Sequence, residues 1–462
     1  MYRTISPSRQ ILHTLSLPAS ILATKLLRIS ALTISVLFAL FTFLPRQELG
    51  SEELFPQSQC PDNEIAHSIV IAVKTGASEA SEKIPTLMQT SLRCAKNVFF
   101  FSDLEQDIGP YHLHDALVDI SPEVKKLDGA FEFYRLQQEA WRRDGNVNAT
   151  KGMKDPNSQN DLAAWTLDKY KNTHILEKVW ELAPNKEWYI VIDADTYVVW
   201  SNLLGWLPSL DSAKKMFIGS VAFIGSTGFA HGGSGTVFSR SLMYDYAVTH
   251  NGTAARVDSK IRNSCCGDVM VSEALKEYGN DLINIQPEFS GQKPGTIPYY
   301  TDYWCQTSIT MHHYNDGDMK AFHRFESSRE NKSIPLTWAE IFGRLVKDQL
   351  QSMPAMQEDW NNYSSEVDVG SGILYEGVKK STAQSFKECA ATCEASGECR
   401  QYAFDGEACY WGKAIRLGER TMPKDGKRWR SGWNQTRMAD WISKQPKCDD
   451  VEFPDWRQSK HY

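Results

Sequence analysis

The sequence predicts a layered α/β domain followed by a small module that is held together by disulfides. Two continuous apolar runs, Ser68 to Lys74 and Asn97 to Ser102, are typical of strands buried on both faces of a parallel sheet. Between them, apolar residues recur at the spacing of an amphipathic helix. Four cysteines then gather between positions 389 and 409. The order of strand, helix and strand indicates the α/β domain, and the cysteine group indicates the module.

The composition excludes several classes of protein. A chain that is 42% hydrophobic and 23% charged can bury a core, which excludes a disordered polymer. Its 50 basic and 57 acidic residues give a net charge of -7, so no general positive field draws it to nucleic acid. We therefore expect a globular protein without a nucleic-acid partner.

An apolar segment near the N-terminus predicts a membrane anchor. Residues 29–45 carry no charge, and at about 1.5 Å per residue they span roughly 25 Å, which suits a thin bilayer. Residues 1–28 contain basic residues and no acidic one, so the positive-inside rule keeps this tail in the cytoplasm. We expect a single-pass type II protein of the Golgi or endoplasmic reticulum membrane. A cleaved signal peptide is the alternative, but its leader would be unusually long.

The cysteines agree with a secretory compartment. All ten follow the apolar segment and none recurs at zinc-finger spacing, so disulfides are expected. The adjacent Cys265 and Cys266 could bond to distant partners such as Cys305, or one of them could stay free. Five sequons are compatible with glycosylation, namely Asn148, Asn251, Asn331, Asn362 and Asn434.

Periodicity predicts the remaining elements. A helix carries Ile84, Leu87, Met88 and Leu92 on one face. Residues 144–161 lack a hydrophobic period and predict a mobile loop, and a long helix over 162–182 leads into a strand over 188–192. Further strands are expected over 216–224 and 307–314. The predicted divisions are a cytoplasmic tail over 1–28, a transmembrane anchor over 29–45, a stem over 46–66, the α/β domain over 67–352, a linker over 353–365, the module over 366–433 and a C-terminal tail over 434–462.

The most informative segment is WYIVIDADTYVV, which begins at Trp188. Its strand ends in Asp193 and Asp195, whose side chains share one face because strand residues alternate. The carboxyl ends of strands are where α/β folds bind ligands, and hard oxygen donors suit Mn²⁺ or Mg²⁺. Taken alone, however, such a pair more often caps a helix or forms a solvated turn.

Four other segments complete a pattern. IAVKT ends the first strand with Lys74 and Thr75, and HGGSGTVFS over 231–239 has glycines that allow close approach of the backbone. CCGDVMVS opens a helix with Asp268 near its start. TSITMHHY over 307–314 carries His312 and His313.

Together these motifs resemble the Fringe-like glycosyltransferase family 31, which also contains the core 1 β-1,3-galactosyltransferases. Over residues 67–325, IAVKT, DADTYV and GGSG match the family's V-A-V-K-T, D-D-D-T-Y-V and G-G-A-G. Gly267-Asp268-Val269 and Thr310-Met311-His312 match its D-D-V/T and S-L-H. Ala194 and Gly267 depart from the pattern, and Gly267 leaves Asp268 without an acidic neighbour.

The resemblance implies a GT-A-type nucleotide-sugar fold, with a mixed, mostly parallel sheet and flanking helices. It also implies inverting β-1,3 transfer of a sugar from a UDP-sugar to a GalNAc-type or related glycan acceptor. Galactose is the first candidate for the transferred sugar. Asp195 and His312 would bind Mn²⁺ or Mg²⁺, and Asp268 would be the catalytic base. The expected contacts to the nucleotide sugar are Thr75, Asp103, Asp193, Gly232 and Gly233.

These assignments have plainer alternatives. Asp268 could be a helix-capping acid, favoured by the helix dipole. One of two adjacent histidines usually faces away from a site, and we favour His312 over His313 as the ligand. Lys171 and Asp103 could contact the nucleotide, but both are more typical of surface charges. The aromatic residues Trp304 and Tyr300 could stack on a sugar, although aromatics in such places usually belong to the core.

The C-terminal module resembles a PAN/Apple domain. In that family a helix is stapled to the sheet, which implies the pairs Cys389–Cys409 and Cys393–Cys399. The module would bind carbohydrate or protein, or pack as an accessory. The rival to the transferase is therefore a catalytically silent secretory protein that binds a glycan or protein through this module.

Overall fold

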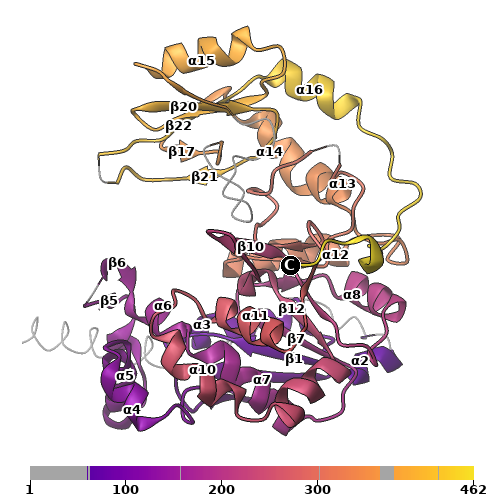
Figure 1. Ribbon diagram of the computed structural model, residues 1–462. Coiled ribbons are helices and arrows are strands. Elements are labelled where there is room, and N and C mark those ends of the chain that lie inside the picture. The colour runs from indigo at the N-terminus through magenta and orange to yellow at the C-terminus, as the bar shows by residue number, and fades with distance from the viewer. Residues whose placement is uncertain (1–59, 61–62, 157, 301, 365–378, 425) are drawn as a thin grey trace, which may run out of the picture. The chain divides into compact units, whose positions relative to one another are not determined.

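The computed structural model describes residues 60, 63–156, 158–300, 302–364, 379–424 and 426–462 (Figure 1). The predicted cytoplasmic tail over 1–28 and the anchor over 29–45 lie outside these residues, as does most of the stem. Among the described residues, no helix is both long and apolar enough to cross a membrane.

An eight-stranded sheet forms the centre of the α/β domain (Figure 1). In spatial order its strands are β13 (Leu282–Asn284), β9 (Phe217–Gly219), β12 (Thr236–Ser239), β7 (Trp188–Asp193), β1 (Ile69–Lys74), β2 (Asn97–Ser102), β4 (Tyr111–Asp115) and β3 (Gln106–Ile108). Only β12 and β3 run against the other strands. The sheet is therefore mostly parallel, as the apolar runs predicted.

Alternate residues of β1 enter two different cores, which explains its unbroken apolar sequence. Ile71 packs with residues of α3 and α8 on one face, and Ala72 packs with residues of α7 and α11 on the other. The helices of this domain are α2 (Glu64–Ser68), α3 (Ala80–Gln89), α4 (Pro122–Leu127), α5 (Ala130–Asp144), α6 (Ala163–Asp168), α7 (Lys171–Leu182), α8 (Trp200–Trp206), α9 (Arg240–Tyr244), α10 (Thr253–Ile261), α11 (Gly267–Glu277), α12 (Asp316–Ser327), α13 (Trp338–Ile341) and α14 (Lys347–Ser352). The domain is a layered α/β structure with helices on both faces of its sheet.

Two predicted elements are divided in the structure. The helix expected over 162–182 forms α6 and α7, because Tyr170 N–H bonds to the carbonyl of Leu167 at 3.2 Å and tightens the turn between them. The strand expected over 216–224 forms β9 and β10 (Val221–Ile224). Strand β9 stays in the central sheet, whereas β10 leaves it and pairs with β11 (Thr227–Ala230).

The segment expected to be a mobile loop over 144–161 has regular structure. Its end forms an antiparallel pair of strands, β5 (Lys154–Asp155) and β6 (Ser158–Leu162). The prediction was wrong here because a hairpin is held by backbone hydrogen bonds and can form without a hydrophobic period.

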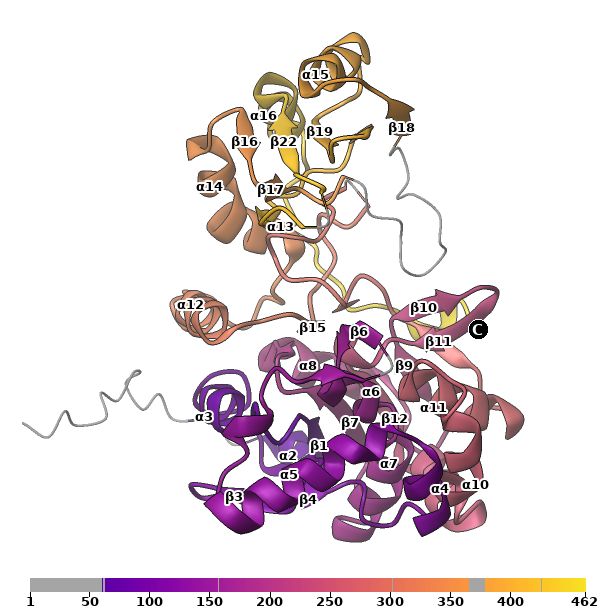
Figure 2. The same ribbon diagram turned by 90° about the vertical axis from the view of Figure 1, so that its left-hand side faces the viewer.

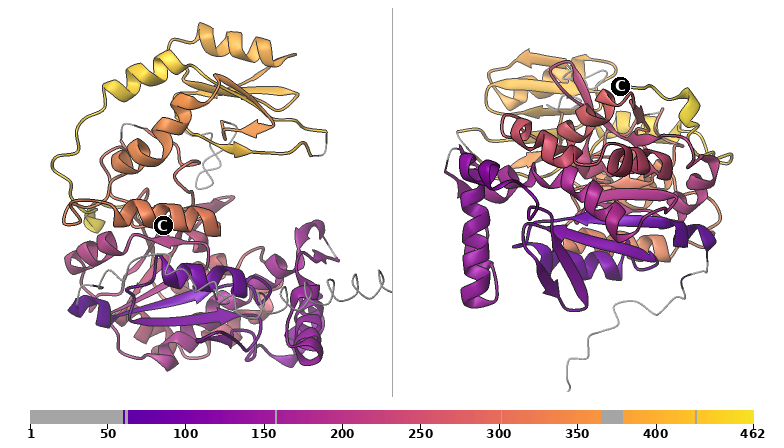
Figure 3. Two further views of the ribbon diagram at one scale, coloured as in Figure 1. Left: turned by 180° about the vertical axis from the view of Figure 1, so that it is seen from behind. Right: turned by 60° about the horizontal axis from the view of Figure 1, so that its bottom comes forward.

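A second, antiparallel sheet forms the module, and helix α15 (Phe386–Ala395) packs on it (Figures 1 and 3). Its strands in order are β16 (Met356–Glu358), β22 (Arg430–Trp433), β19 (Gln401–Phe404), β20 (Ala408–Gly412) and β18 (Lys379–Thr382). Strand β16 lies within the expected linker over 353–365. Helix α16 (Gln435–Ser443) follows in the expected tail over 434–462.

The disulfides confirm one set of expected pairs and resolve another. Cys389–Cys409 ties α15 to β20, and Cys393–Cys399 ties the end of α15 to the segment before β19. Cys305 bonds to Cys448, whereas Cys265 and Cys266 bond to each other. No cysteine is free in the part of the chain that the structure describes.

One of the five sequons is not accessible in the folded chain. The side chain of Asn362 is fully buried, and its amide donates to the carbonyl of Tyr402 at 3.1 Å. Asn148, Asn251 and Asn331 are exposed. Glycosylation of the folded protein therefore remains open at these three positions and is excluded at Asn362.

Candidate functional site

A short three-stranded sheet brings the acidic pair and a distant histidine together. It consists of β8 (Tyr197–Val198), β15 (Thr310–Met311) and β14 (Phe289–Ser290). Strand β15 pairs antiparallel with β8, and the N–H of Tyr314 donates to the carbonyl of Asp195 at 3.0 Å. This pairing places His312 beside Asp195, although the two residues are 117 positions apart.

The three side chains have the spacing of metal ligands. His312 Nε2 lies 3.0 Å from Asp195 Oδ1 and 3.7 Å from Asp193 Oδ2. One ligand atom of each residue lies within 4.8 Å of the others. Two carboxylates and one imidazole suit Mn²⁺, so this donor set fits the divalent ion that the sequence predicted. His313 has a left-handed backbone with φ 65° and is not part of the group.

Two lysines compensate the charge of these carboxylates. Lys83 Nζ lies 3.2 Å from Asp195 Oδ2, and Lys74 pairs with Asp168 and lies 3.3 Å from Asp193 Oδ1. Burial raises the pKa of Asp195, but the hydrogen bond and charge of His312 and the charge of Lys83 outweigh it, so the pKa lies below its ordinary value. A cation bound here would compete with the two ammonium groups.

The glycine-rich turn, η3 (Gly232–Ser234), packs directly on the histidine. A Cβ atom at Gly233 would lie 2.3 Å from His312 Cε1, so only glycine lets the backbone approach the ring this closely. Gly235 follows with a φ of +81°. Thr196 Oγ1 donates to the carbonyl of Gly233 at 2.8 Å and fixes the turn to the segment after the aspartates.

Asp268 lies in the first turn of α11 and faces the same turn. Its Oδ2 accepts the N–H of Gly232 at 3.0 Å, and its Oδ1 accepts the N–H of Val269 at 2.9 Å. Burial nevertheless raises the pKa of Asp268, because these hydrogen bonds and the charge of Lys74 only partly offset it. A carboxylate has further lone pairs, so the side chain can still accept a proton.

These residues line one cleft of about 460 Å³. Of the eight residues predicted for the site, it brings together seven: Thr75, Asp193, Asp195, Gly232, Gly233, Asp268 and His312. It also contains Lys74, Lys83, Asp168, His231 and the bonded pair Cys265–Cys266. His313 lines the same space, which is called the cleft below.

Asp103, the eighth predicted residue, lies behind the wall of the cleft. It is fully buried, its Oδ1 accepts the N–H of Ala77 at 2.7 Å, and Lys171 Nζ lies 3.4 Å away. Lys171 is also buried and donates to the carbonyl of Thr75 at 2.8 Å. The expectation that Asp103 and Lys171 are surface charges was therefore wrong. They pair beneath the turn that follows β1, and Lys171 also lines the cleft.

Several residues of the cleft were not predicted from the sequence. Lys74 could have been predicted, because this residue ends the first strand at the edge of the sheet where ligands bind. Nothing in the sequence indicated Lys83 or Asp168, which reach the cleft from two helices. The interpretation of Trp304 as a core residue is confirmed, since it packs between Phe342 and Trp441.

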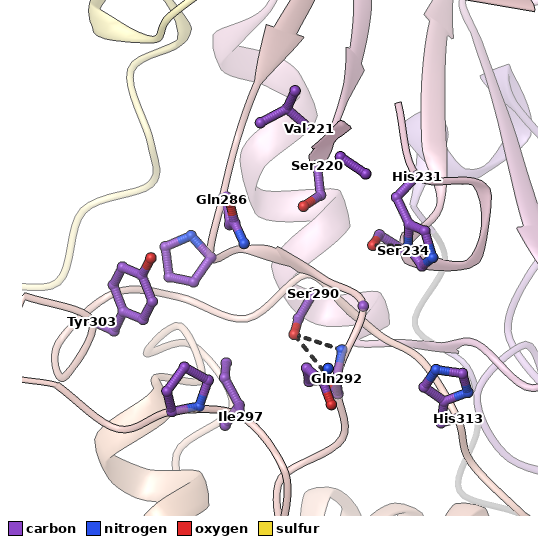
Figure 4. Close-up of a pocket in the computed structure, with 14 residues that line it drawn as sticks. Ser220, Val221, His231, Ser234, Gln286, Ser290, Gln292, Ile297, Tyr303 and His313 are labelled. Atoms are coloured by element: carbon purple, nitrogen blue, oxygen red, sulfur yellow. Dashed lines mark hydrogen bonds between the residues drawn. The ribbon is translucent and has the colours of Figure 1, made fainter. Parts of the chain in front are cut away.

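A smaller hollow of about 110 Å³ adjoins the cleft and shares His231 and His313 with it (Figure 4). Its polar side chains are Ser220, Ser234, Gln286, Ser290, Gln292 and Tyr303. Burial and the charge of His312 lower the pKa of His231 to about 3 and that of His313 to about 4. No Asp, Glu, Lys or Arg occurs among the described residues that line the hollow, so it suits an uncharged polar ligand.

Comparison with known proteins does not assign the chain to a family. No family model matches it, and no curated protein matches it in sequence.

Proposed function

We propose that the chain is an inverting, metal-dependent glycosyltransferase that uses a UDP-sugar, with a GT-A-type domain and a PAN/Apple-like module. The observation that carries this proposal is the convergence of Asp193, Asp195 and His312 in a cleft that also contains Asp268. The motifs that resemble glycosyltransferase family 31 support the same function. Galactose is the first candidate for the donor sugar, with a β-1,3 linkage to a GalNAc-type or related glycan.

The proposed chemistry assigns one task to each residue. Asp195 and His312 would hold Mn²⁺ or Mg²⁺, which supplies positive charge to a leaving diphosphate. Asp193, beside them, would bind the ribose, and Lys74 adds a second positive charge at that end of the cleft. As the acceptor oxygen bonds to the anomeric carbon and the bond to UDP breaks, Asp268 takes the proton of the acceptor hydroxyl.

The hollow beside the cleft supports a neutral acceptor. Its lining includes His231 and His313, whose rings lie beside that of His312, and its amide and hydroxyl groups suit the hydroxyl and acetamido groups of a sugar. The catalytic domain would act in the lumen of the Golgi or endoplasmic reticulum, anchored by residues 29–45.

A second candidate is a silent binding protein. Both carboxylate oxygens of Asp268 already accept backbone N–H groups, which is what a purely structural acid at a helix start would do. In this case the module, and not the cleft, would carry the function.

Release of UDP from a panel of UDP-sugars, with and without Mn²⁺, tests the proposal. We expect Mn²⁺-dependent release from at least one donor, loss of that release in Asp195→Ala, and β-1,3 linkage in the product. Asp119→Ala is the matched control, because this exposed aspartate pairs with Lys178 and does not line the cleft, so its loss should leave the rate unchanged. Absence of release from every donor would contradict the transferase and favour the binding protein.

A further inference from the structure

The β3–β4 hairpin, whose strands are labelled in Figure 2, forms one edge of the central sheet, and β13 forms the other. In strand β4, His112 and His114 flank Leu113, which is fully buried, so both imidazoles lie on the outer face. The antiparallel register pairs Gln106 with Leu113. One step further along, Glu105 lies next to His114. Three ligand-type side chains therefore share one patch of the sheet edge.

Their distances fit a metal ion with nitrogen and oxygen ligands. Glu105 Oε1 lies 2.8 Å from His112 Nε2 and 3.9 Å from His114 Nδ1. One ligand atom of each residue lies within 4.8 Å of the others. Tetrahedral zinc with bonds of about 2.0–2.1 Å separates neighbouring ligand atoms by roughly 3.3 Å. The observed separations lie on both sides of this value, so small side-chain rotations complete the geometry.

Neighbouring groups orient two of the three ligands. Glu105 Oε2 accepts the N–H of Asp115 at 2.7 Å, which leaves Oε1 toward the imidazoles. His112 Nδ1 bonds to Asp107 Oδ1 at 2.8 Å, which leaves Nε2 toward Glu105. Histidines that bind metal are commonly held in this way, with a carboxylate on the second ring nitrogen.

The plain alternative is a group of solvated ion pairs. The side chains of His112 and Glu105 are 49% and 58% exposed, and such ion pairs stabilise a protein little. The alternative explains the contacts between His112 and the carboxylates. His114 also packs on Phe101, with 5.6 Å between the ring centroids, but its Nδ1 faces the same carboxylate as His112, which is the arrangement that a shared metal ion would produce.

We propose that Glu105, His112 and His114 form a second metal site, selective for a borderline cation such as Zn²⁺, with water in the fourth position. Two imidazoles and one carboxylate favour zinc over Mn²⁺ or Mg²⁺, whereas the cleft, with its two carboxylates, has the harder donor set. This site does not depend on the proposed transferase activity.

The position of the hairpin gives the bound ion a structural consequence. Asp103 and Gln106, on either side of Glu105, both bond to the backbone of Ala77 in the turn after β1. Zinc would join Glu105, which directly precedes β3, to His112 and His114 in β4. Bound zinc would therefore stabilise the segment that holds the turn after β1, without contacting the cleft.

Zinc titration of the metal-stripped chain by calorimetry tests the site. The titration is done in an Asp195→Ala background, so that zinc in the cleft does not mask the hairpin. We expect one zinc ion per chain and a rise in Tm, because a ligand that binds only the folded state stabilises it. In this background, a further His112→Ala substitution should weaken zinc binding by about 100-fold or more, and a further Asp107→Asn substitution should weaken it by about tenfold.

Two further measurements keep the result unambiguous. His250→Ala, added to the same Asp195→Ala background, is the control. It removes a partly exposed histidine that stacks on Tyr278, far from the hairpin in sequence, and it should leave zinc affinity unchanged. Glu105→Gln preserves side-chain shape and should also weaken zinc binding, while the Tm in metal-free buffer reports that each variant folds. No zinc binding in the Asp195→Ala chain, or equal binding after His112→Ala, would overturn the proposal.

Discussion

Replacing Gly233 by alanine should remove His312 from the metal group. The added Cβ would lie 2.3 Å from Cε1, 2.5 Å from Nδ1 and 2.7 Å from Nε2 of His312, all shorter than any real carbon contact. The ring must move by about 1 Å to reach ordinary contact, whereas metal–ligand distances tolerate only about 0.2 Å. Removing a residue that merely orients a metal ligand typically lowers metal affinity by about 10- to 100-fold. Displacing the ligand itself should therefore lower the affinity for Mn²⁺ by at least about tenfold.

The neighbouring glycine provides the matched control. A Cβ at Gly232 would lie 3.4 Å from Asp268 Oδ2, which is an ordinary contact, so Gly232→Ala should bind Mn²⁺ nearly as the wild type does. Calorimetric titration with Mn²⁺ measures both variants, and thermal melting should show a fall of about 1–3 kcal/mol in stability for Gly233→Ala alone, from overpacking. Equal Mn²⁺ affinity of the two variants would refute the packing of the turn on His312.

Three further results are expected. Asp268→Asn should lower the transfer rate by roughly 10² or more and leave Mn²⁺ affinity unchanged, because it removes only the proton acceptor. Glu288→Gln should stabilise the protein at pH 8 by about 3 kcal/mol in urea unfolding, because burial raises the pKa of Glu288 from 4.5 to about 7 and the wild type loses stability as the pH rises through this range. Loss of the Cys389–Cys409 bond should destabilise the module by about 3 kcal/mol, against about 2 for its other disulfide, because the closed loops span 20 and 6 positions.

Each of these results has a contrasting outcome. Glu273→Gln, on the exposed side of the same helix as Asp268, should keep the full rate, and an unchanged rate in Asp268→Asn would remove that residue from the mechanism. At pH 4 the Glu288→Gln variant should nearly match the wild type, since the glutamate is then mostly protonated in both folded and unfolded chains. Equal destabilisation by the two disulfide losses, measured by proteolysis of the folded chain, would contradict the loop-length reasoning.

The strands of the central sheet could be predicted because burial on both faces requires an unbroken run of apolar residues. In β1, Ile71 and Ala72 serve different cores, so the whole strand is apolar. The β5–β6 hairpin has no such apolar pattern, because its polar residues pair through their backbones. Likewise, the division of the strand over 216–224 depends on β10 finding β11 as its partner, which periodicity does not report.

The candidate site could be predicted where its residues end strands and follow motifs. The grouping of Asp195 with His312 was expected from the resemblance, and the three-stranded sheet provides the reason for it. The burial of Asp103 and Lys171 could not be foreseen, because it depends on partners brought together by the fold, namely the two residues themselves and Asp168. The bond between Cys265 and Cys266 was equally beyond reach, since adjacent cysteines leave every pairing open.

The Cys305–Cys448 disulfide joins positions 143 apart, and the whole module lies between them. A protease that cuts the chain once inside this span therefore produces two pieces that still migrate together on a gel without reductant. Separation would require both a cut and a thiol. A nicked molecule would keep the module at a high effective concentration beside the domain that carries the cleft.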